Sequence, residues 1–364
     1  MFLVSWFVLA TLWIVGFCVV GETSKFRHWS NALFPILSLV TITVLAASAA
    51  NYDVVDKNRY ALEFESMSFA SPDEIFADTV ADGREPAYLL FNWIVGLFTH
   101  DARVYFVVAA AFCGIMLAAT LWLVLGSGWQ TAVVLYVTFC FGFFMDYSSF
   151  LLRQGLSISF LFLALALVLR GARVVWIVLL VGVGLLFHWS AIPAALIIVL
   201  IRLIRMRTDI LLGVWVILSA AYFTGMNERL AGPLGASVEQ VDVYSDPALA
   251  AEYTGGTNRP SFWLFSAGPL AVSYVAFKKL TVLPEWYPKL LNAFILLNGY
   301  FLLMGFVFFS DRLAAYSWSL VPAVVSIPFL AYRGTAAPVV RLGLLVAFTL
   351  WAVYFGSFDV LVDR

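Results

Sequence analysis

The sequence has few charged residues, few cysteines and few histidines. Of its 364 residues, 12% are charged and 63% are hydrophobic, whereas a soluble domain has about 25% charged and about 45–50% apolar residues. Cys18, Cys113 and Cys140 all lie inside apolar runs, which argues against a disulfide framework or a thiolate metal site. The three histidines are far apart and have no second ligand at metal-binding spacing, so no metal site is predicted.

The sequence also lacks an excess of charge of one sign. Its net charge is −1 and it has no basic tail, so nothing indicates a nucleic-acid partner. A nucleotide-binding glycine-rich loop is absent as well, and no cofactor is predicted. Residues 1–20 lack a basic start and a small-residue cleavage site, which favours a first membrane helix over a removed signal peptide.

Long apolar runs dominate what is present. Runs near 20 residues recur, and each is long enough as a helix to cross about 30 Å of hydrocarbon. The sequence therefore predicts an all-α polytopic membrane protein with about twelve transmembrane helices in a single membrane domain, residues 1–364. The predicted helices cover 2–20, 32–50, 104–125, 131–145, 155–170, 174–187, 190–205, 210–226, 262–278, 290–309, 313–332 and 340–357.

Lysines and arginines in the short connections predict the topology, because such residues accumulate on the cytoplasmic side. The clusters are Lys25/Arg27, Arg170/Arg173, Arg202/Arg205/Arg207, Lys278/Lys279/Lys289 and Arg333/Arg341. All lie on one side if 174–205 is a helical hairpin that turns at residues 188–190. For all the clusters to lie on one side, the segment 86–99, about 14 residues, must also be a re-entrant or interfacial helix.

This topology places both termini and two long connections outside. The connection 51–99 contains the re-entrant candidate and an amphipathic helix at 56–66. The connection 227–261 contains Gly232-Pro233 and Gly255-Gly256, which predict an irregular external loop.

Arginines gather on the predicted outer side. They are Arg59, Arg84, Arg153 and Arg312. A single arginine there is more often a structural ion pair or an interfacial anchor. However, the planar guanidinium fork suits phosphate, and a diphosphate needs more than one such donor. Four arginines on one side therefore favour an anionic substrate group.

Three residues on the same side are candidates for a general base. Glu85 precedes Pro86 at the expected start of the re-entrant helix, where it is either a helix cap or a base held at the membrane surface. Asp56 shares one helical face with Arg59, Tyr60 and Glu63, which is either a solvated stripe or a wall of a substrate cleft. His188 ends an apolar helix, where a histidine is commonly a cap.

Taken in order, these features resemble the EpsG-like family of bacterial exopolysaccharide and O-antigen polymerases, which are relatives of Wzy. The matching motifs are Asp56-x-x-x-Tyr60-x-x-x-Phe64, Glu85-Pro86-Ala87-Tyr88, Arg153-Gln154-Gly155-Leu156, His188-Trp189-Ser190-Ala191 and Arg312-x-x-x-Tyr316. The resemblance spans nearly the whole chain, although each motif is short. Gly155, Leu156 and Phe64 depart from the residues that the family more often has.

The resemblance implies a multi-pass glycosyltransferase of the bacterial inner membrane, similar in plan to the GT-C enzymes. Such an enzyme transfers a growing glycan from polyprenyl diphosphate to a hydroxyl of the next lipid-linked repeat unit, on the periplasmic or outer face. The implied partners are the polyprenyl-diphosphate-linked oligosaccharide, membrane lipids, a chain-length regulator and a flippase.

The chemistry of that reaction suggests a role for each candidate. Arg153 and Arg312 would hold the diphosphate and stabilise the charge that develops on the leaving oxygen, with Arg59 or Arg84 assisting. Glu85, Asp56 and His188, in that order, are the base candidates. Tyr60, Gln154 and Tyr316 are supporting residues.

Three other functions remain as alternatives. A transporter or flippase of lipid-linked oligosaccharides would also need arginines for the diphosphate. It should, however, show charges near mid-helix and repeated halves, whereas the charges here lie at helix ends and no repeat is visible. A different membrane transferase, such as an O-acyltransferase or a polyprenyl-monophosphate-dependent enzyme, is the second alternative. A structural subunit of a secretion complex is the third.

Overall fold

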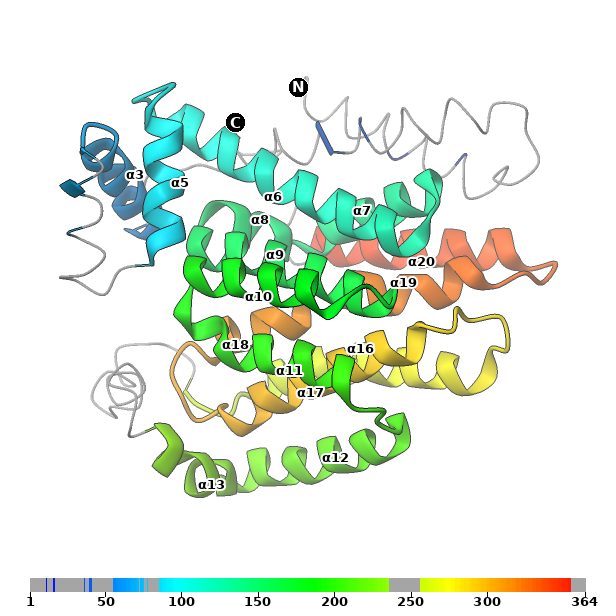
Figure 1. Ribbon diagram of the computed structural model, residues 1–364. Coiled ribbons are helices and arrows are strands. Elements are labelled where there is room, and N and C mark those ends of the chain that lie inside the picture. Colours follow the sequence, from blue (N-terminus) through cyan, green and yellow to red (C-terminus); the bar gives the residue numbers. More distant parts are fainter. Residues whose placement is uncertain are drawn as a thin grey trace. The chain divides into compact units, whose positions relative to one another are not determined.

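A computed structural model describes residues 55–71, 85–235 and 256–354, together with a few single positions outside these ranges. Within them every regular element is a helix (Figure 1). Five helices are long and apolar enough to cross a membrane, and six if one bent pair is a single span. The chain is therefore a polytopic helical membrane protein, while the count of twelve spans and the GT-C-like plan stay predictions. Apart from single positions, the predicted helices 2–20 and 32–50 lie outside the described residues.

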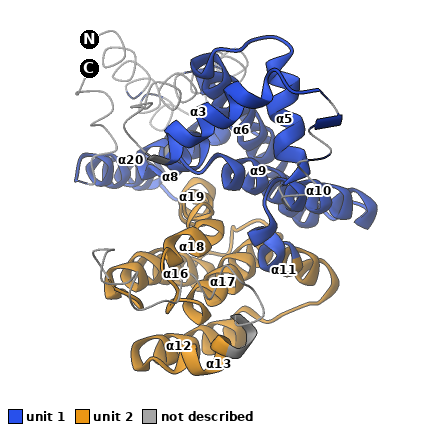
Figure 2. Ribbon diagram, turned by 90° about the vertical axis from the view of Figure 1, so that its left-hand side faces the viewer, with its two compact units in different colours: residues 1–195, 333–364 blue, residues 196–332 orange. Residues whose placement is uncertain are grey.

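The chain divides into two compact units, coloured separately in Figure 2. The first, residues 1–195 and 333–364, holds α3 (Val55–Met67), α5 (Pro86–Gly96), α6 (Ala102–Leu125), α7 (Gly128–Phe141), α8 (Phe143–Ser149), α9 (Leu152–Leu169), α10 (Val174–Phe187), the 3₁₀ turn η1 (Trp189–Ala191) and α20 (Ala337–Tyr354). The second, residues 196–332, holds α12 (Thr208–Thr224), α13 (Met226–Gly235), α16 (Pro260–Lys279), α17 (Tyr287–Leu303), α18 (Ser310–Trp318) and α19 (Val321–Ala331). The boundary falls within α11 (Ile192–Leu203).

Helix α9 is central to the first unit, because it packs against α6, α8 and α10 (Figure 1). Gly155 allows α8 and α9 to approach closely. A Cβ at Gly155 would lie 2.0 Å from the carbonyl oxygen of Tyr147, so no larger residue fits without moving a backbone. This contact sets the position of the first turn of α9, which carries Arg153.

The predicted hairpin in 174–205 is confirmed as two helices. Helix α10 ends at Phe187, and α11 begins at Ile192 with Pro193 as its second residue. Proline is tolerated there because the first N–H groups of a helix have no intrahelical acceptor.

Several predicted helix boundaries were wrong. The predicted helix 131–145 is broken at Gly142, whose φ of 90° stops α7 before α8 begins. The predicted helix 290–309 ends at Leu303. The predicted helix 313–332, in contrast, agrees with the candidate span Ser310–Ala331, which contains α18 and α19. Conversely, α13 forms where an irregular loop was expected from residue 227, because Pro233 falls near the end of that helix and does not prevent its first turns.

Among the described residues, two short helices precede α6 in the first unit. At about 1.5 Å per residue, the 11 residues of α5 extend about 17 Å, which is too short to cross a hydrocarbon core of about 30 Å. Helix α3 coincides with the amphipathic helix predicted at 56–66. Its buried face contains Lys57, Tyr60 and Phe64. Tyr60 is buried and Arg59 is exposed, so the alternative of a solvated stripe does not hold for Tyr60, and the wall of a substrate cleft stays a prediction.

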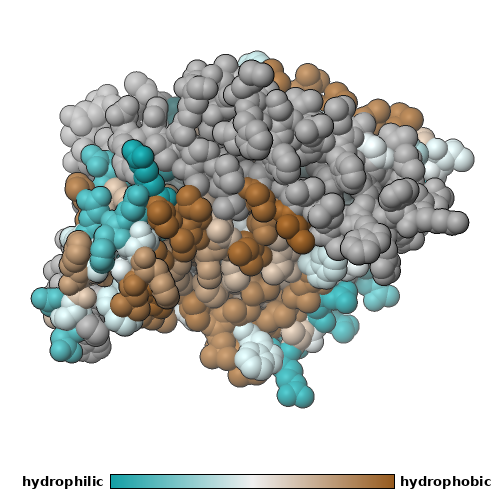
Figure 3. All heavy atoms as spheres, turned by 90° about the horizontal axis from the view of Figure 1, so that it is seen from above, coloured by the Kyte–Doolittle hydropathy of each residue, from teal (hydrophilic) through white to brown (hydrophobic). Residues whose placement is uncertain are grey.

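The outward surfaces of the long helices are apolar. On α6, for example, Val107, Ile115 and Trp122 are all exposed, and hydrophobic side chains cover much of the coloured surface in Figure 3. Large apolar side chains that face outward along a spanning helix suit contact with lipid.

Candidate functional site

Glu85 stands at the N-cap position of α5, directly before Pro86, and is 7% exposed. Its backbone is extended, and its side chain makes no hydrogen bond to the first turn of α5. The alternative that Glu85 is a helix cap was therefore wrong. The carboxylate instead reaches the Arg153 guanidinium and the His188 imidazole.

Glu85, Arg153 and His188 form a single hydrogen-bonded group, called here the charged cluster. Arg153 Nη1 donates to Glu85 Oε2 at 2.9 Å, and His188 Nδ1 lies 3.0 Å from Glu85 Oε1. Arg153 is the second residue of α9, and His188 directly follows α10. Three segments far apart in the sequence are thus joined through the two oxygens of one carboxylate.

The two partners determine the ionisation of Glu85. Burial alone would raise the pKa of this carboxyl, but the hydrogen bond from His188 and the positive charge of Arg153 outweigh burial and lower the pKa to about 2. Glu85 is therefore an ionised carboxylate and a very weak base at neutral pH. It accepts the Nδ1–H of His188, an assignment that follows from the acceptor character of a carboxylate.

Aromatic rings line the charged cluster. The guanidinium carbon of Arg153 lies 5.8 Å from the centre of the Tyr60 ring and 5.7 Å from that of Tyr88, within the range of cation–π attraction. The Tyr88 hydroxyl donates to Glu63 Oε2 at 3.3 Å. Because burial and the nearby Glu63 raise the pKa of Tyr88 well above its ordinary value, this hydroxyl keeps its proton.

Three residues of this region were missed by the sequence reasoning. Tyr105 donates to Asn92 Oδ1 at 2.6 Å, next to Tyr88, and Lys57 is fully buried with its ammonium 4.2 Å from the centre of the Phe106 ring. A signal existed for Asn92, since it is an amide one turn after Tyr88 in an apolar helix. Lys57 gave no comparable signal, because a lysine in a mixed-charge segment is normally solvated.

The other predicted site residues fall into separate groups. Asp56 and Arg59 pair with each other at 3.9 Å on the more exposed side of α3, and Gln154 is buried on α9. Among the described residues, Glu85 pairs with Arg153 and His188 and not with Arg59. Arg84 lies outside the described residues.

Arg312 and Tyr316 belong to the second compact unit. Both lie on α18, where the guanidinium carbon of Arg312 is 4.6 Å from the centre of the Phe309 ring and Tyr316 is buried. The convergence of Arg312 with Arg153 on one substrate stays a prediction.

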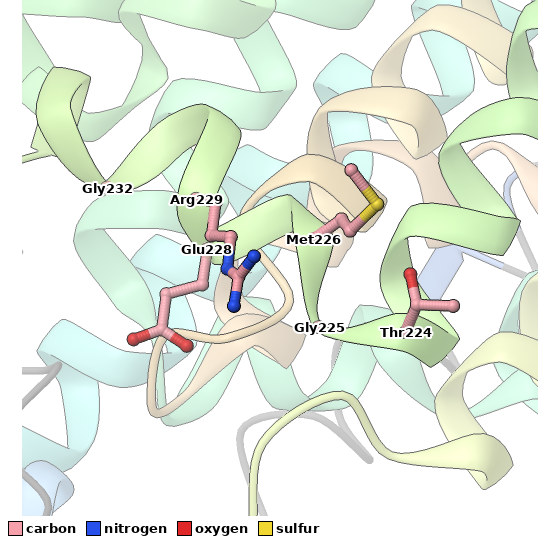
Figure 4. Close-up of a pocket in the computed structure, with 6 residues that line it drawn as sticks. All are labelled: Thr224, Gly225, Met226, Glu228, Arg229 and Gly232. Atoms are coloured by element: carbon pink, nitrogen blue, oxygen red, sulfur yellow. The ribbon is translucent and has the colours of Figure 1, made fainter.

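A pocket of about 620 Å³ lies at the bend between α12 and α13, in the second unit. Figure 4 shows its lining residues, which are Thr224, Gly225, Met226, Glu228, Arg229 and Gly232. None of the predicted site residues lines it. Within the ranges that the structure describes, no three histidine, cysteine or acidic side chains gather as metal ligands do.

Comparison with known proteins identifies the family. Neither a search of curated proteins nor a search of solved structures gave a match. The model of the EpsG family, in contrast, matches residues 33–359, which include every motif on which the resemblance rested. The chain belongs to the EpsG family.

Proposed function

We propose that the protein is a polysaccharide polymerase that uses polyprenyl-diphosphate-linked substrates. It transfers a growing glycan from polyprenyl diphosphate to a hydroxyl of an incoming lipid-linked repeat unit, on the outer face of the bacterial inner membrane. Membership of the EpsG family supports a polymerase of polysaccharide biosynthesis in general. The observation that carries the specific proposal is the bridging of Arg153 and His188 by the buried Glu85 carboxylate.

His188 is the general base in this proposal, and Glu85 orients it. A base acts best when its pKa lies near the working pH, and a carboxyl with a pKa of about 2 is far below that range. When the Nδ1–H of His188 is held by Glu85, the lone pair of the neutral ring resides on Nε2. Within the described part of the chain, Nε2 makes no hydrogen bond, so it is available to a substrate hydroxyl.

The proposed step transfers one proton and exchanges one bond at the anomeric carbon. Nε2 of His188 removes the proton of the acceptor hydroxyl while its oxygen attacks the anomeric carbon of the donor glycan. The bond from that carbon to the diphosphate oxygen breaks, and the diphosphate leaves with the electron pair. The imidazolium that results lies against the Glu85 carboxylate, which stabilises its charge.

Arg153 binds the diphosphate in this scheme. One of its nitrogens contacts Glu85, and the side chain retains 25% exposure, so its other donors can reach a phosphate oxygen. Charge grows on the leaving oxygen as the bond breaks, and a fixed guanidinium therefore stabilises the transition state more than the ground state. Arg312 and the assisting Arg59 and Arg84 complete the proposed set, and a flippase and a chain-length regulator are the proposed protein partners.

Glu85→Gln and His188→Gln, singly and together, test the proposal in a strain that lacks the native gene. Each variant should lower polymer formation about 10²–10⁴-fold, with single lipid-linked units accumulating in the outer leaflet. The double variant should be little worse than either single one, because residues that act as a unit are not additive. The matched control is His100→Gln, since His100 is an exposed histidine of the same unit that stacks on Phe69.

Two outcomes would contradict the proposal. Normal polymer from membrane-inserted His188→Gln would remove His188 as the base. Accumulation of single units in the inner leaflet would instead favour a flippase, since the units would then have failed to cross the membrane.

A further inference from the structure

Arg259 directly precedes α16 in the second compact unit. Arg312 lies in the first turn of α18 in the same unit. Both arginines are half-buried, so each is ordered by its neighbours and still open to solvent. Each guanidinium lies against an aromatic ring, Phe262 at 4.8 Å for Arg259 and Phe309 at 4.6 Å for Arg312.

Hydrogen bonds fasten the segment before Arg259 to the end of α17. The Asn258 backbone N–H donates to the Gly305 carbonyl at 2.8 Å. The side-chain amides of Asn227 and Asn258 bond each other at 2.8 and 3.1 Å, and Asn227 also donates to the Leu302 carbonyl. Because α17 leads directly into the segment before α18, this amide pair fixes the approach to both arginines.

A close contact supports the same arrangement. The Tyr222 hydroxyl donates to the backbone carbonyl of Arg259 at 3.0 Å. A Cβ at Gly305 would lie 2.1 Å from a ring carbon of Tyr222 and 2.7 Å from Asn258 Oδ1. Only glycine therefore fits at position 305, where the backbone packs closely against Tyr222 and Asn258, the residues that hold Arg259.

Backbone strain is concentrated at the same place. Within the described ranges, two residues other than glycine have positive φ, Asn258 at 49° and Phe309 at 56°. Asn258 directly precedes Arg259, and Phe309 directly precedes α18 with Arg312 in its first turn. A phenylalanine in this conformation is strained, and such strain persists mainly at functional sites where neighbouring contacts enforce it.

Asp311 links the two arginines electrostatically. Its carboxyl interacts with the charges of both Arg312 and Arg259, although the latter is distant in sequence. An arginine has five N–H donors in a rigid fork, so it can contact a carboxylate and still donate to a phosphate oxygen. Asp311 therefore lies within electrostatic range of both guanidinium groups.

We propose that Arg259 and Arg312 together form a binding site for a phosphate-bearing ligand. Two segments with positive φ, at Asn258 and at Phe309, hold the two arginines in place. The first is also fixed by the side-chain hydrogen bonds between Asn227 and Asn258. The inference rests on the proposed function, in which the ligand is the diphosphate of a lipid-linked substrate. It adds Arg259 to that function as a residue that touches the phosphate oxygens.

Arginine labelling tests the site without any substitution. Phenylglyoxal modifies accessible guanidinium groups, and mass spectrometry of the full chain in lipid nanodiscs gives the rate at each arginine. Inorganic diphosphate should slow labelling of both Arg259 and Arg312 at least threefold and leave Arg229, an exposed arginine on α13, unchanged. Polyprenyl diphosphate in the nanodisc should protect the same pair at a lower concentration.

Two results of the labelling experiment would overturn the inference. Equal rates at Arg259 with and without either ligand would exclude it from a phosphate site. Protection by inorganic diphosphate alone, with none from the polyprenyl form, would overturn the assignment to a lipid-linked substrate.

Arg259→Lys tests whether the two arginines act together. The variant keeps the charge and loses the fork, so protection of Arg312 should need at least tenfold more inorganic diphosphate. Arg229→Lys is the matched control and should leave the protecting concentration unchanged. Unaltered protection of Arg312 in Arg259→Lys would mean that Arg259 does not share the ligand.

Labelling reports binding and the strain assay reports polymer, so the two proposals can fail separately. Protection of Arg259 in a protein whose His188→Gln variant polymerises normally would retain the site and reject the proposed mechanism. Loss of polymer in His188→Gln without protection of Arg259 would do the reverse.

Discussion

The two compact units each contain a polar cluster, but the clusters are built differently. In the first, Glu85, Arg153 and His188 are ionisable, and two of the three side chains are 25% exposed. In the second, Asn298 accepts from Trp215 Nε1 at 2.8 Å and donates to the hydroxyls of Ser266 at 2.7 Å and Ser317 at 3.1 Å.

The second group, called here the neutral cluster, also includes Trp318, which donates to Ser266 at 2.9 Å. It joins α12, α16, α17 and α18, and Asn298, Ser266 and Ser317 are completely buried. Uncharged groups that satisfy one another can be buried in a membrane protein at modest cost, whereas a buried charge costs much more. The comparison indicates that the neutral cluster fixes helix packing, while the charged cluster retains ionised groups near solvent for chemistry.

The largest effect is expected from Arg153→Lys. Lysine keeps the positive charge but cannot bind Glu85 and a phosphate with one planar fork. Polymer formation per inserted molecule should fall about 10²–10³-fold, the usual loss when one donor to a developing anion is removed, while thermal stability changes little. Polymer length and yield on gels measure the effect, with Arg103→Lys, an exposed arginine on α6, as the control. Near-normal polymer in Arg153→Lys would show that the guanidinium fork is dispensable. The charged cluster could then no longer be distinguished from the neutral cluster by a role in chemistry.

Asn298→Ala should give the opposite pattern, a loss of stability with activity per folded molecule preserved. The substitution removes three hydrogen bonds and leaves the buried Trp215 N–H without its acceptor, which should destabilise the protein by about 3 kcal/mol. Asn292→Ala is the control, because Asn292 donates one described bond, to the Met206 carbonyl, and its loss should cost about 1 kcal/mol. Denaturant unfolding in mixed micelles measures both. A stable but inactive Asn298→Ala would mean that the neutral cluster is also functional.

Sequence reasoning identified the members of the charged cluster but not their bonds. Glu85, Arg153 and His188 each interrupt an apolar segment with a polar group, and the lysine and arginine pattern placed all three on one side of the membrane. Which atoms meet depends on how α5, α9 and α10 pack, and helical periodicity does not contain that information. The sequence therefore ranked Glu85 first as the base, whereas the hydrogen bond from His188 and the charge of Arg153 make it a weak one.

The rotation of each helix about its own axis and the residue at which it ends could also not be predicted from the sequence. A stripe at positions i, i+3 and i+4 defines a face but not its direction, and so the burial of Tyr60 on α3 could not be predicted. Helix α17 ends at Leu303, and Gly305 just after it lies close to Tyr222, a residue remote in sequence. In contrast, Asn298 was predictable as a contact between helices, because an amide inside an apolar span needs a partner.

Gly155→Ala should have a smaller effect that connects packing to the charged cluster. Its new methyl group would meet the Tyr147 carbonyl at 2.0 Å, so α8 and α9 must separate, and overpacking of this kind costs about 1–3 kcal/mol. Gly182→Ala on α10 is the matched control, because nothing lies within 4 Å of its Cβ position. That substitution should be neutral or slightly stabilising. Equal thermal stability of the two variants would contradict the close approach of α8 and α9.

The smallest effect is expected from lowering the pH, which changes the charge of the charged cluster and leaves the neutral cluster unchanged. The pKa of Glu85 is lowered from 4.5 to about 2 in the folded protein, so its ion pairs contribute full stability above about pH 4.5. This contribution is lost progressively as the pH falls toward 2, because the unfolded chain then binds the proton more readily. Between pH 6 and pH 3.5 only part of that window is crossed, and the wild-type melting temperature should fall about 1–3 °C more than that of Glu85→Gln. The fall in Asn298→Ala should equal that in the wild type, since the neutral cluster binds no proton. An identical acid response in Glu85→Gln and the wild type would show that the Glu85 carboxylate is not held by Arg153 and His188, and the two clusters would then differ only in their exposure to solvent.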